Sequence, residues 1–85
     1  MNLKIIYWNV RWLNEKDKRL QIWNLIRIWQ ADVICLQETK MEFITRGFIK
    51  SLWGCQHIDW VNLSSLGASG GILVMWDRMV VEKLE

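Results

Sequence analysis

The chain has 85 residues, of which 52% are hydrophobic and seven are tryptophan, and its formal net charge is +2. This length allows one small domain, and a weak positive charge spread along the chain gives no sign of a dedicated basic nucleic-acid-binding face. Cys35 and Cys55 lack metal-site spacing and are too few for a disulfide scaffold, so we expect free thiols in a reducing compartment. The tryptophans carry more apolar surface than a lone domain of this size usually buries. This excess indicates that the chain packs against additional protein surface.

No segment predicts export or membrane insertion. No apolar run approaches the roughly 20 residues that cross a bilayer. The run at residues 3–8 is interrupted by Lys4 and is too short for the core of a signal peptide. We therefore expect an intracellular protein without a membrane partner, in the nucleus or the cytoplasm.

The first predicted element is a strand at residues 3–8, whose β-branched and aromatic residues favour burial on both faces. Residues 9–14 predict a loop. Residues 15–30 predict a helix with Asn14 as its N-cap. Its apolar stripe is formed by Ile22, Leu25, Ile26 and Trp29. Further apolar residues off this stripe, which predict cover on more than one side, are Leu20, Trp23 and Ile28.

Residues 32–37 are a second short apolar run and predict another strand. Strand, helix and strand in this order predict a βαβ unit with parallel strands and a right-handed crossover. The carboxyl ends of the two strands then share one edge of the sheet, where open α/β sheets usually bind ligands.

The second half of the chain predicts a hairpin. Its expected segments are a loop with a short helix near residues 48–53, strands at residues 57–63 and 72–76, a Ser- and Gly-rich turn at residues 64–71, and an edge strand at residues 79–84. The predicted class is therefore α/β, a βαβ unit plus an antiparallel hairpin.

Two polar residues follow the predicted parallel strands. Asn9 comes directly after the first strand and Glu38 directly after the second, so their side chains can converge at one edge of the sheet. An amide and a carboxylate oxygen are the hard ligands that Mg²⁺ prefers. Spacing alone favours the plainer interpretation, in which Glu38 is a solvated loop acid and Asn9 a turn former.

Residues 7–11 (Tyr-Trp-Asn-Val-Arg) and 36–40 (Leu-Gln-Glu-Thr-Lys) resemble the first two signature segments of the endonuclease/exonuclease/phosphatase superfamily. Residues 31–40 (Ala-Asp-Val-Ile-Cys-Leu-Gln-Glu-Thr-Lys) are most similar to the endonuclease domains of plant LINE-type (non-LTR) retrotransposons. Residues 67–74 and 76–77 resemble the next segment of those elements. The resemblance covers nearly the whole chain.

The resemblance implies roles for four residues. Glu38 matches the family glutamate that binds the catalytic Mg²⁺ or Mn²⁺, and Asn9 matches the asparagine that helps to hold the metal and the scissile phosphate. Arg11 is a weaker candidate for contact with phosphate, and Lys40 for bracing the glutamate or approaching the DNA backbone. The implied fold is a four-layer α/β/β/α sandwich that hydrolyses DNA phosphodiester bonds by metal-assisted attack of water.

The sequence departs from the family pattern at two points. Trp12 stands where the family usually has glycine, which tolerates positive φ and close backbone approach. The later family segments, a Gly-Asp-Phe-Asn-like segment and a closing Asp-His pair, have no counterpart before Glu85, and His57 is expected to be a surface or turn residue. We therefore expect residues 1–85 to be a truncated N-terminal part of the family domain, an incomplete sandwich that is inactive alone and binds metal weakly.

Two other functions are weighed against this one. In a serine hydrolase Ser69 would act with His57 and Asp59, but a predicted strand, where the nucleophile turn needs a helix, follows the serine. In a non-catalytic nucleic-acid-binding module, the bases of single strands would stack on a surface formed by Trp12, Trp53 and Trp60. Burial of most of these tryptophans in a core is the favoured interpretation.

A third alternative is a transposon relic without present function. Half of a sandwich leaves a sheet face and an edge uncovered. This alternative therefore predicts poor solubility or loose packing of the isolated chain.

Overall fold

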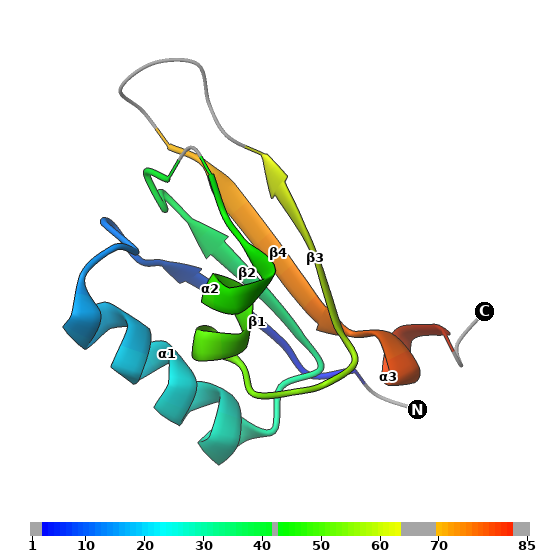
Figure 1. Ribbon diagram of the computed structural model, residues 1–85. Helices are drawn as coiled ribbons and strands as arrows, with labels where there is room; N and C mark the ends of the chain where they lie inside the picture. Colours follow the sequence, from blue (N-terminus) through cyan, green and yellow to red (C-terminus); the bar gives the residue numbers. More distant parts are fainter. Residues whose placement is uncertain (1–2, 42, 64–69, 83–85) are drawn as a thin grey trace.

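The structure, a computed structural model, describes residues 3–41, 43–63 and 70–82. These residues form a four-stranded sheet, in the strand order β1-β2-β4-β3, and three helices (Figure 1). The elements in chain order are β1 (Ile5–Asn9), α1 (Lys16–Trp29), β2 (Val33–Gln37), α2 (Arg46–Leu52), β3 (Ile58–Leu63), β4 (Ile72–Asp77) and α3 (Arg78–Glu82). The predicted α/β class is confirmed.

Strand pairing follows the predicted topology. β1 and β2 are parallel, with Ile5 opposite Val33 and Asn9 opposite Gln37. β4 pairs antiparallel with β2 on one side and with β3 on the other. The parallel pair and the antiparallel hairpin are therefore confirmed. Of the predicted turn at residues 64–71, residues 64–69 lie outside the described residues.

The helices α1 and α2 cover one face of the sheet (Figure 1). Alternate residues of the strands point to this face, and they meet apolar residues one turn apart on the helices. The buried residues of this layer include Ile34 and Leu36 of β2, Leu73 and Met75 of β4, Ile22 and Ile26 of α1, and Ile49 and Leu52 of α2. Burial of each such side chain contributes about 1.5–3 kcal/mol, so this layer is the main source of stability.

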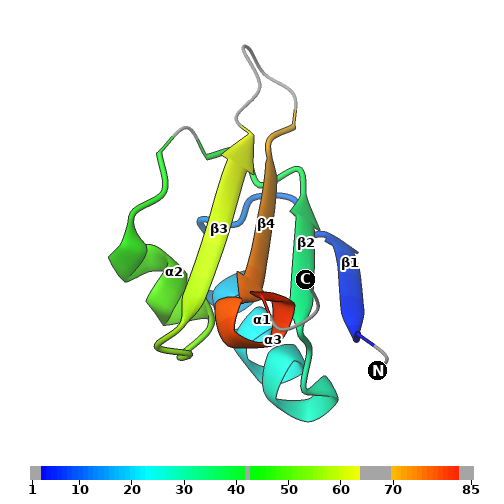
Figure 2. The ribbon, with the colours of Figure 1, turned by 90° about the vertical axis from the view of Figure 1, so that its right-hand side faces the viewer.

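The opposite face of the sheet is largely open in the described chain; Figure 2 shows α3 in front of its lower end. Strand register aligns the residues of this face in three rows across the sheet: Ile5, Val33, Trp76 and Asp59; Tyr7, Cys35, Val74 and Val61; and Asn9, Gln37, Ile72 and Leu63. Tyr7 is 70% exposed and Leu63 is 59% exposed. This apolar face is the kind of surface that normally meets another layer.

The prediction that the first strand is buried on both faces is wrong. Ile5 and Tyr7 are exposed, because β1 is an edge strand and no described element covers their face of it. The stripe predicted for the helix is correct at Ile22 and Ile26, whereas Trp29 in the last turn is 60% exposed. The expected cover on a second side is correct only at Trp23, which is half-buried against the segment after α2, whereas the other off-stripe residues, Leu20 and Ile28, are exposed.

The two predicted ends of α1 differ slightly from the observed ones. The N-cap residue is Glu15 and not Asn14, and it makes no side-chain capping hydrogen bond. The helix therefore starts with backbone bonding alone, including the 3.2 Å bond that Arg19 N donates to Glu15 O. At the other end, Gln30 adopts the left-handed conformation that commonly terminates helices.

The prediction of an edge strand at residues 79–84 is wrong at residues 79–82, and residues 83–84 lie outside the described residues. The chain forms the short helix α3 directly after β4. The Asp77 carboxylate accepts a 2.9 Å hydrogen bond from Met79 N, as the residue before a helix commonly does, and Arg78 N donates to His57 O. This local bonding turns the chain out of the sheet plane. No helix within the described ranges is both long and apolar enough to cross a membrane.

The two faces of β3 provide a direct test of the layer arrangement. Ile58 is 1% exposed on the covered face, and Val61 is 45% exposed on the open face. We expect Ile58→Thr to lower the free energy of unfolding by about 2 kcal/mol or more. The matched change Val61→Thr should leave it within about 0.5 kcal/mol and reduce binding of a hydrophobic dye. Urea melts followed by circular dichroism measure both; equal destabilisation by the two variants would contradict an open face.

Candidate functional site

Backbone hydrogen bonds join the ends of the two parallel strands. Asn9 is opposite Gln37, and Val10 N donates to Gln37 O at 2.9 Å. Further along, Leu13 N donates to Thr39 O at 3.1 Å. The loops that follow β1 and β2 therefore lie side by side, and the two strand ends are neighbours as expected. Glu38 directly follows β2, whereas Asn9 is the last residue of β1 and not the residue after it.

A pair of glycines supports the second of these loops from the other side. Gly70 and Gly71 both have φ of +89°, and their carbonyl oxygens accept hydrogen bonds from Lys40 N at 2.9 Å and Thr39 N at 3.2 Å. A Cβ on Gly71 would lie 2.8 Å from the Thr39 Oγ1 atom. Glycine is required there both by the backbone conformation and by the space. Residues 70–71 thus contact residues 39–40 directly.

Left-handed backbone conformations concentrate at the same place. Five non-glycine residues of the described chain have positive φ, and four of them lie in these two loops: Arg11 at +43°, Trp12 at +61°, Glu38 at +56° and Lys40 at +56°. The fifth, Gln30, ends a helix. Each such conformation costs roughly 1–2 kcal/mol for a residue with a Cβ. Strain of this kind collects at functional sites, where the surrounding structure maintains it.

The charged side chains of the loops are paired. Arg11 Nε lies 3.7 Å from Glu38 Oε2, and the two side chains are 75% and 43% exposed. The Lys40 ammonium lies 4.2 Å from the centre of a Trp12 ring. Solvent weakens an ion pair this exposed to at most about 1 kcal/mol. A divalent cation or a phosphate can therefore compete for these groups at little cost.

The donor set fits a magnesium-type ion in kind but not in number. Asn9 and Glu38 supply an amide oxygen and a carboxylate, which are hard ligands of the right type. Within residues 3–41, 43–63 and 70–82, no group of three or more His, Cys, Asp or Glu side chains is placed to hold a metal. The neighbouring Thr39 hydroxyl is buried without a hydrogen-bond partner. The described residues therefore show two oxygen ligands of the right type at this edge and no complete metal site.

Other residues weighed in the sequence lie away from this edge. His57 is exposed in a turn, as expected, and its carbonyl oxygen bonds to Arg78 N at the far end of the sheet. Trp53 is 9% exposed and Trp60 packs against the core, so the core interpretation holds for both, whereas Trp12 is 55% exposed. Ser69 lies outside the described residues.

Both cysteines are free thiols, as expected. Cys35 lies in the middle of β2, on the open sheet face. Burial raises the pKa of the Cys35 thiol above its ordinary value. A thiol that resists ionisation is a poor nucleophile and a poor metal ligand. Neither its position nor its raised pKa therefore makes Cys35 part of the candidate site.

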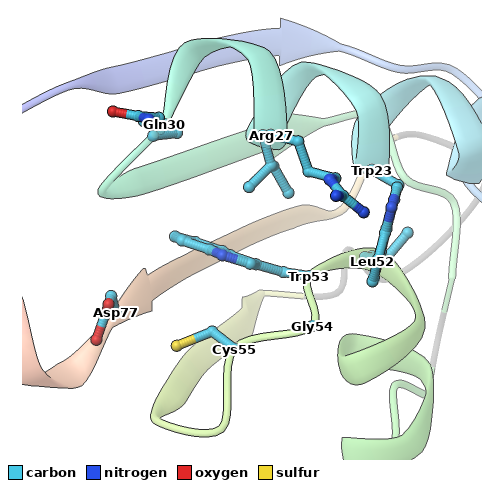
Figure 3. Close-up of a pocket in the computed structure, with 10 residues that line it drawn as sticks. Trp23, Arg27, Gln30, Leu52, Trp53, Gly54, Cys55 and Asp77 are labelled. Carbon is cyan, nitrogen blue, oxygen red and sulfur yellow. The ribbon is translucent and has the colours of Figure 1, made fainter.

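A cavity of about 410 Å³ lies at the opposite end of the sheet, between the end of α1, the segment after α2 and the end of β4 (Figure 3). Its walls include Trp23, Arg27, Trp53 and Asp77. A Cβ on Gly54 would lie 2.8 Å from an edge carbon of Trp23, so the chain passes close beneath that indole. None of the predicted site residues lines this cavity.

The described chain is thus an α/β fold in which polar, charged and strained residues gather at the ends of two parallel strands. A family model described as the Endonuclease/Exonuclease/phosphatase family matches residues 6–84. The chain belongs to the endonuclease/exonuclease/phosphatase family, which generally depends on divalent metal ions. No curated protein matches the chain.

Replacement of Gly71 tests how residues 70–71 support the loop that follows β2. Gly71→Ala places a Cβ against the Thr39 hydroxyl at a φ of +89°, and we expect it to lower the free energy of unfolding by at least about 1–2 kcal/mol. Gly47→Ala is the control, because its nearest contact is 3.8 Å away and it lies in α2. Helix propensity should make that variant up to about 1 kcal/mol more stable. Chemical denaturation curves decide; a neutral Gly71→Ala would refute the tight approach.

Proposed function

We propose that the chain forms the metal-binding side of a Mg²⁺-dependent phosphodiesterase domain of the DNA endonuclease type, and that it is inactive alone. The observation that supports this most strongly is the pairing of the β1 and β2 ends, which brings Asn9 and Glu38 to one edge of the sheet. Family membership supports the reaction class.

The proposal assigns separate roles to four residues at this edge of the sheet. Glu38 and Asn9 hold the cation, whose chemistry when bound is to stabilise charge that develops on a phosphate during hydrolysis. Arg11 lies 3.7 Å from Glu38 and neutralises the carboxylate until the cation binds. Both Arg11 and Lys40 then supply positive charge to the phosphate backbone of the substrate.

The expected inactivity follows from the groups present at this edge. One carboxylate and one amide hold Mg²⁺ poorly when other ligands and substrate phosphates are missing. His57, the single histidine, lies at the far end of the sheet and cannot act as a general base at Glu38. A missing general base removes a contribution of roughly 10²–10⁴-fold to the rate.

The proposal also includes a more specific evolutionary origin for the chain. The string Ala-Asp-Val-Ile-Cys-Leu-Gln-Glu-Thr-Lys at residues 31–40 is similar to the endonuclease domains of plant LINE-type retrotransposons. Such a domain cuts DNA, so DNA is the proposed partner.

Binding of Mn²⁺, a paramagnetic substitute for Mg²⁺, tests the half-site. We expect a dissociation constant on the order of millimolar, measured by electron paramagnetic resonance of the free ion. Glu38→Gln should abolish this binding, because it removes the carboxylate charge, and Asn9→Ala should weaken it several-fold.

The control for this test is Asp59→Asn. Asp59 lies at the other end of the sheet, opposite Trp76, which in turn is opposite the first residue of β2. This variant should bind Mn²⁺ as the unmodified chain does. Full binding by Glu38→Gln, or no binding by any form of the chain, would reject the half-site. The second result, together with no binding of DNA, is what a relic without function predicts.

The Arg11 side chain provides a further test of the same site. Because its guanidinium faces Glu38 at 3.7 Å, Arg11→Gln should tighten Mn²⁺ binding, by no more than a few-fold since the pair is exposed. Raising the salt concentration should shrink the difference between the two proteins. Weaker Mn²⁺ binding by Arg11→Gln would show that the arginine supports the ion instead of competing with it.

A further inference from the structure

We propose that Trp12 and Lys40 form a stacking subsite for one unpaired nucleobase of single-stranded nucleic acid, beside the half-site. The inference rests on the proposed function, since it assumes that the Asn9 and Glu38 edge meets a phosphodiester chain. It adds a binding element that the family pattern does not supply, because the family usually has glycine where Trp12 stands.

The backbone around Trp12 holds the indole outward. The φ of Trp12 is +61°, a conformation that a bulky side chain avoids. It is maintained by its neighbours: Leu13 is fully buried and donates to Thr39 O at 3.1 Å, and Glu15 N donates to Trp12 O at 3.1 Å. The indole remains 55% exposed. An exposed aromatic residue in a strained, well-anchored loop is costly for folding alone, which favours a role in binding.

Lys40 adds the charge that such a platform needs. Its ammonium lies 4.2 Å from the centre of a Trp12 ring, the shortest cation–ring distance in the described chain. Proteins that bind single strands combine an aromatic face, on which a base stacks, with positive charge for the backbone. A base on the indole would place its phosphate within reach of Lys40 and of Arg11, which faces Glu38.

A second exposed tryptophan, Trp29 of α1, lacks these features and serves as the comparison. Trp29 is 60% exposed, so it offers as much indole surface as Trp12. In the ranges the structure describes, no cation lies over its ring, and it is in the last turn of a helix. Exposure alone therefore does not distinguish the two residues. The subsite proposal distinguishes them, because it expects only Trp12 to bind a base.

The test is binding of a fluorescently labelled dT12 oligonucleotide to the full chain in EDTA, followed by fluorescence anisotropy. Trp12→Leu, which keeps apolar bulk without an aromatic face, should weaken binding about 5- to 150-fold, the loss of one stacked base. Trp12→Gly, which suits the positive φ, should show the same loss. Trp12→Phe should bind nearly as the unmodified chain does, and so should Trp29→Leu.

Two further comparisons separate stacking from charge. An oligonucleotide with abasic sugars retains its phosphates but should bind about as weakly to the unmodified chain as dT12 does to Trp12→Leu. Lys40→Met should reduce the slope of log binding constant against log salt by about 0.7, the value for one phosphate on a single strand. Lys50→Met, on the exposed side of α2, should leave that slope unchanged.

Wild-type affinity of Trp12→Leu for dT12, or abasic binding as tight as dT12 binding, would overturn the subsite. A loss in Trp29→Leu equal to that in Trp12→Leu would do the same. Thermal melts of each variant show that the fold is retained, and Trp12→Gly guards against a loss caused by backbone strain. Because EDTA removes metal, failure of this experiment leaves the Mn²⁺ half-site standing, and failure of Mn²⁺ binding leaves the stacking result intact.

Discussion

The parallel register of β1 and β2 is the constraint on which the rest of the structure depends. It places Asn9 opposite Gln37 and lets Val10 N donate to Gln37 O, so that Glu38 begins the next loop at the same edge. A slip of one residue would send every side chain of β1 to the other face of the sheet. The inward residues of both strands prevent such a slip, because Ile6 and Trp8 of β1 pack against the core, and Ile34 and Leu36 of β2 face the helices. Core packing therefore sets the geometry of the site.

The two loops depart from local conformational preferences, and neighbouring segments maintain the departure. Arg11, Trp12, Glu38 and Lys40 have positive φ, and the carbonyl groups of Gly70 and Gly71 hold the second loop by backbone hydrogen bonds. Proteins usually violate local rules where function requires it. The glycine pair thus holds residues 70–71 against residues 39–40, beside the loop that follows β1.

The sequence predicted the elements whose pattern has a single interpretation. The change from strand to helix periodicity located β1, α1 and β2, and the Ser- and Gly-rich stretch between apolar runs indicated the hairpin of β3 and β4. The implied half sandwich predicted an uncovered sheet face, but the apolar pattern did not place Ile5 and Tyr7 on it, because they are as apolar as buried strand residues. Nor did the sequence predict α3, which depends on the local hydrogen bond at Asp77. The neighbouring positions of the β1 and β2 ends followed from topology. The positive φ of Trp12 did not, because it accompanies the hydrogen bond from Leu13 N to Thr39 O, which no sequence pattern records.

The central claim is that an amide and a carboxylate from neighbouring strand ends share one cation. Paramagnetic broadening of amide NMR signals by added Mn²⁺ measures this most directly, because the effect falls steeply with distance from the ion. The account predicts that broadening begins at the Asn9 side-chain amide and at the backbone amides of Val10 and Glu38. Broadening that instead begins near Asp59 or Asp77, with those signals intact, would contradict it.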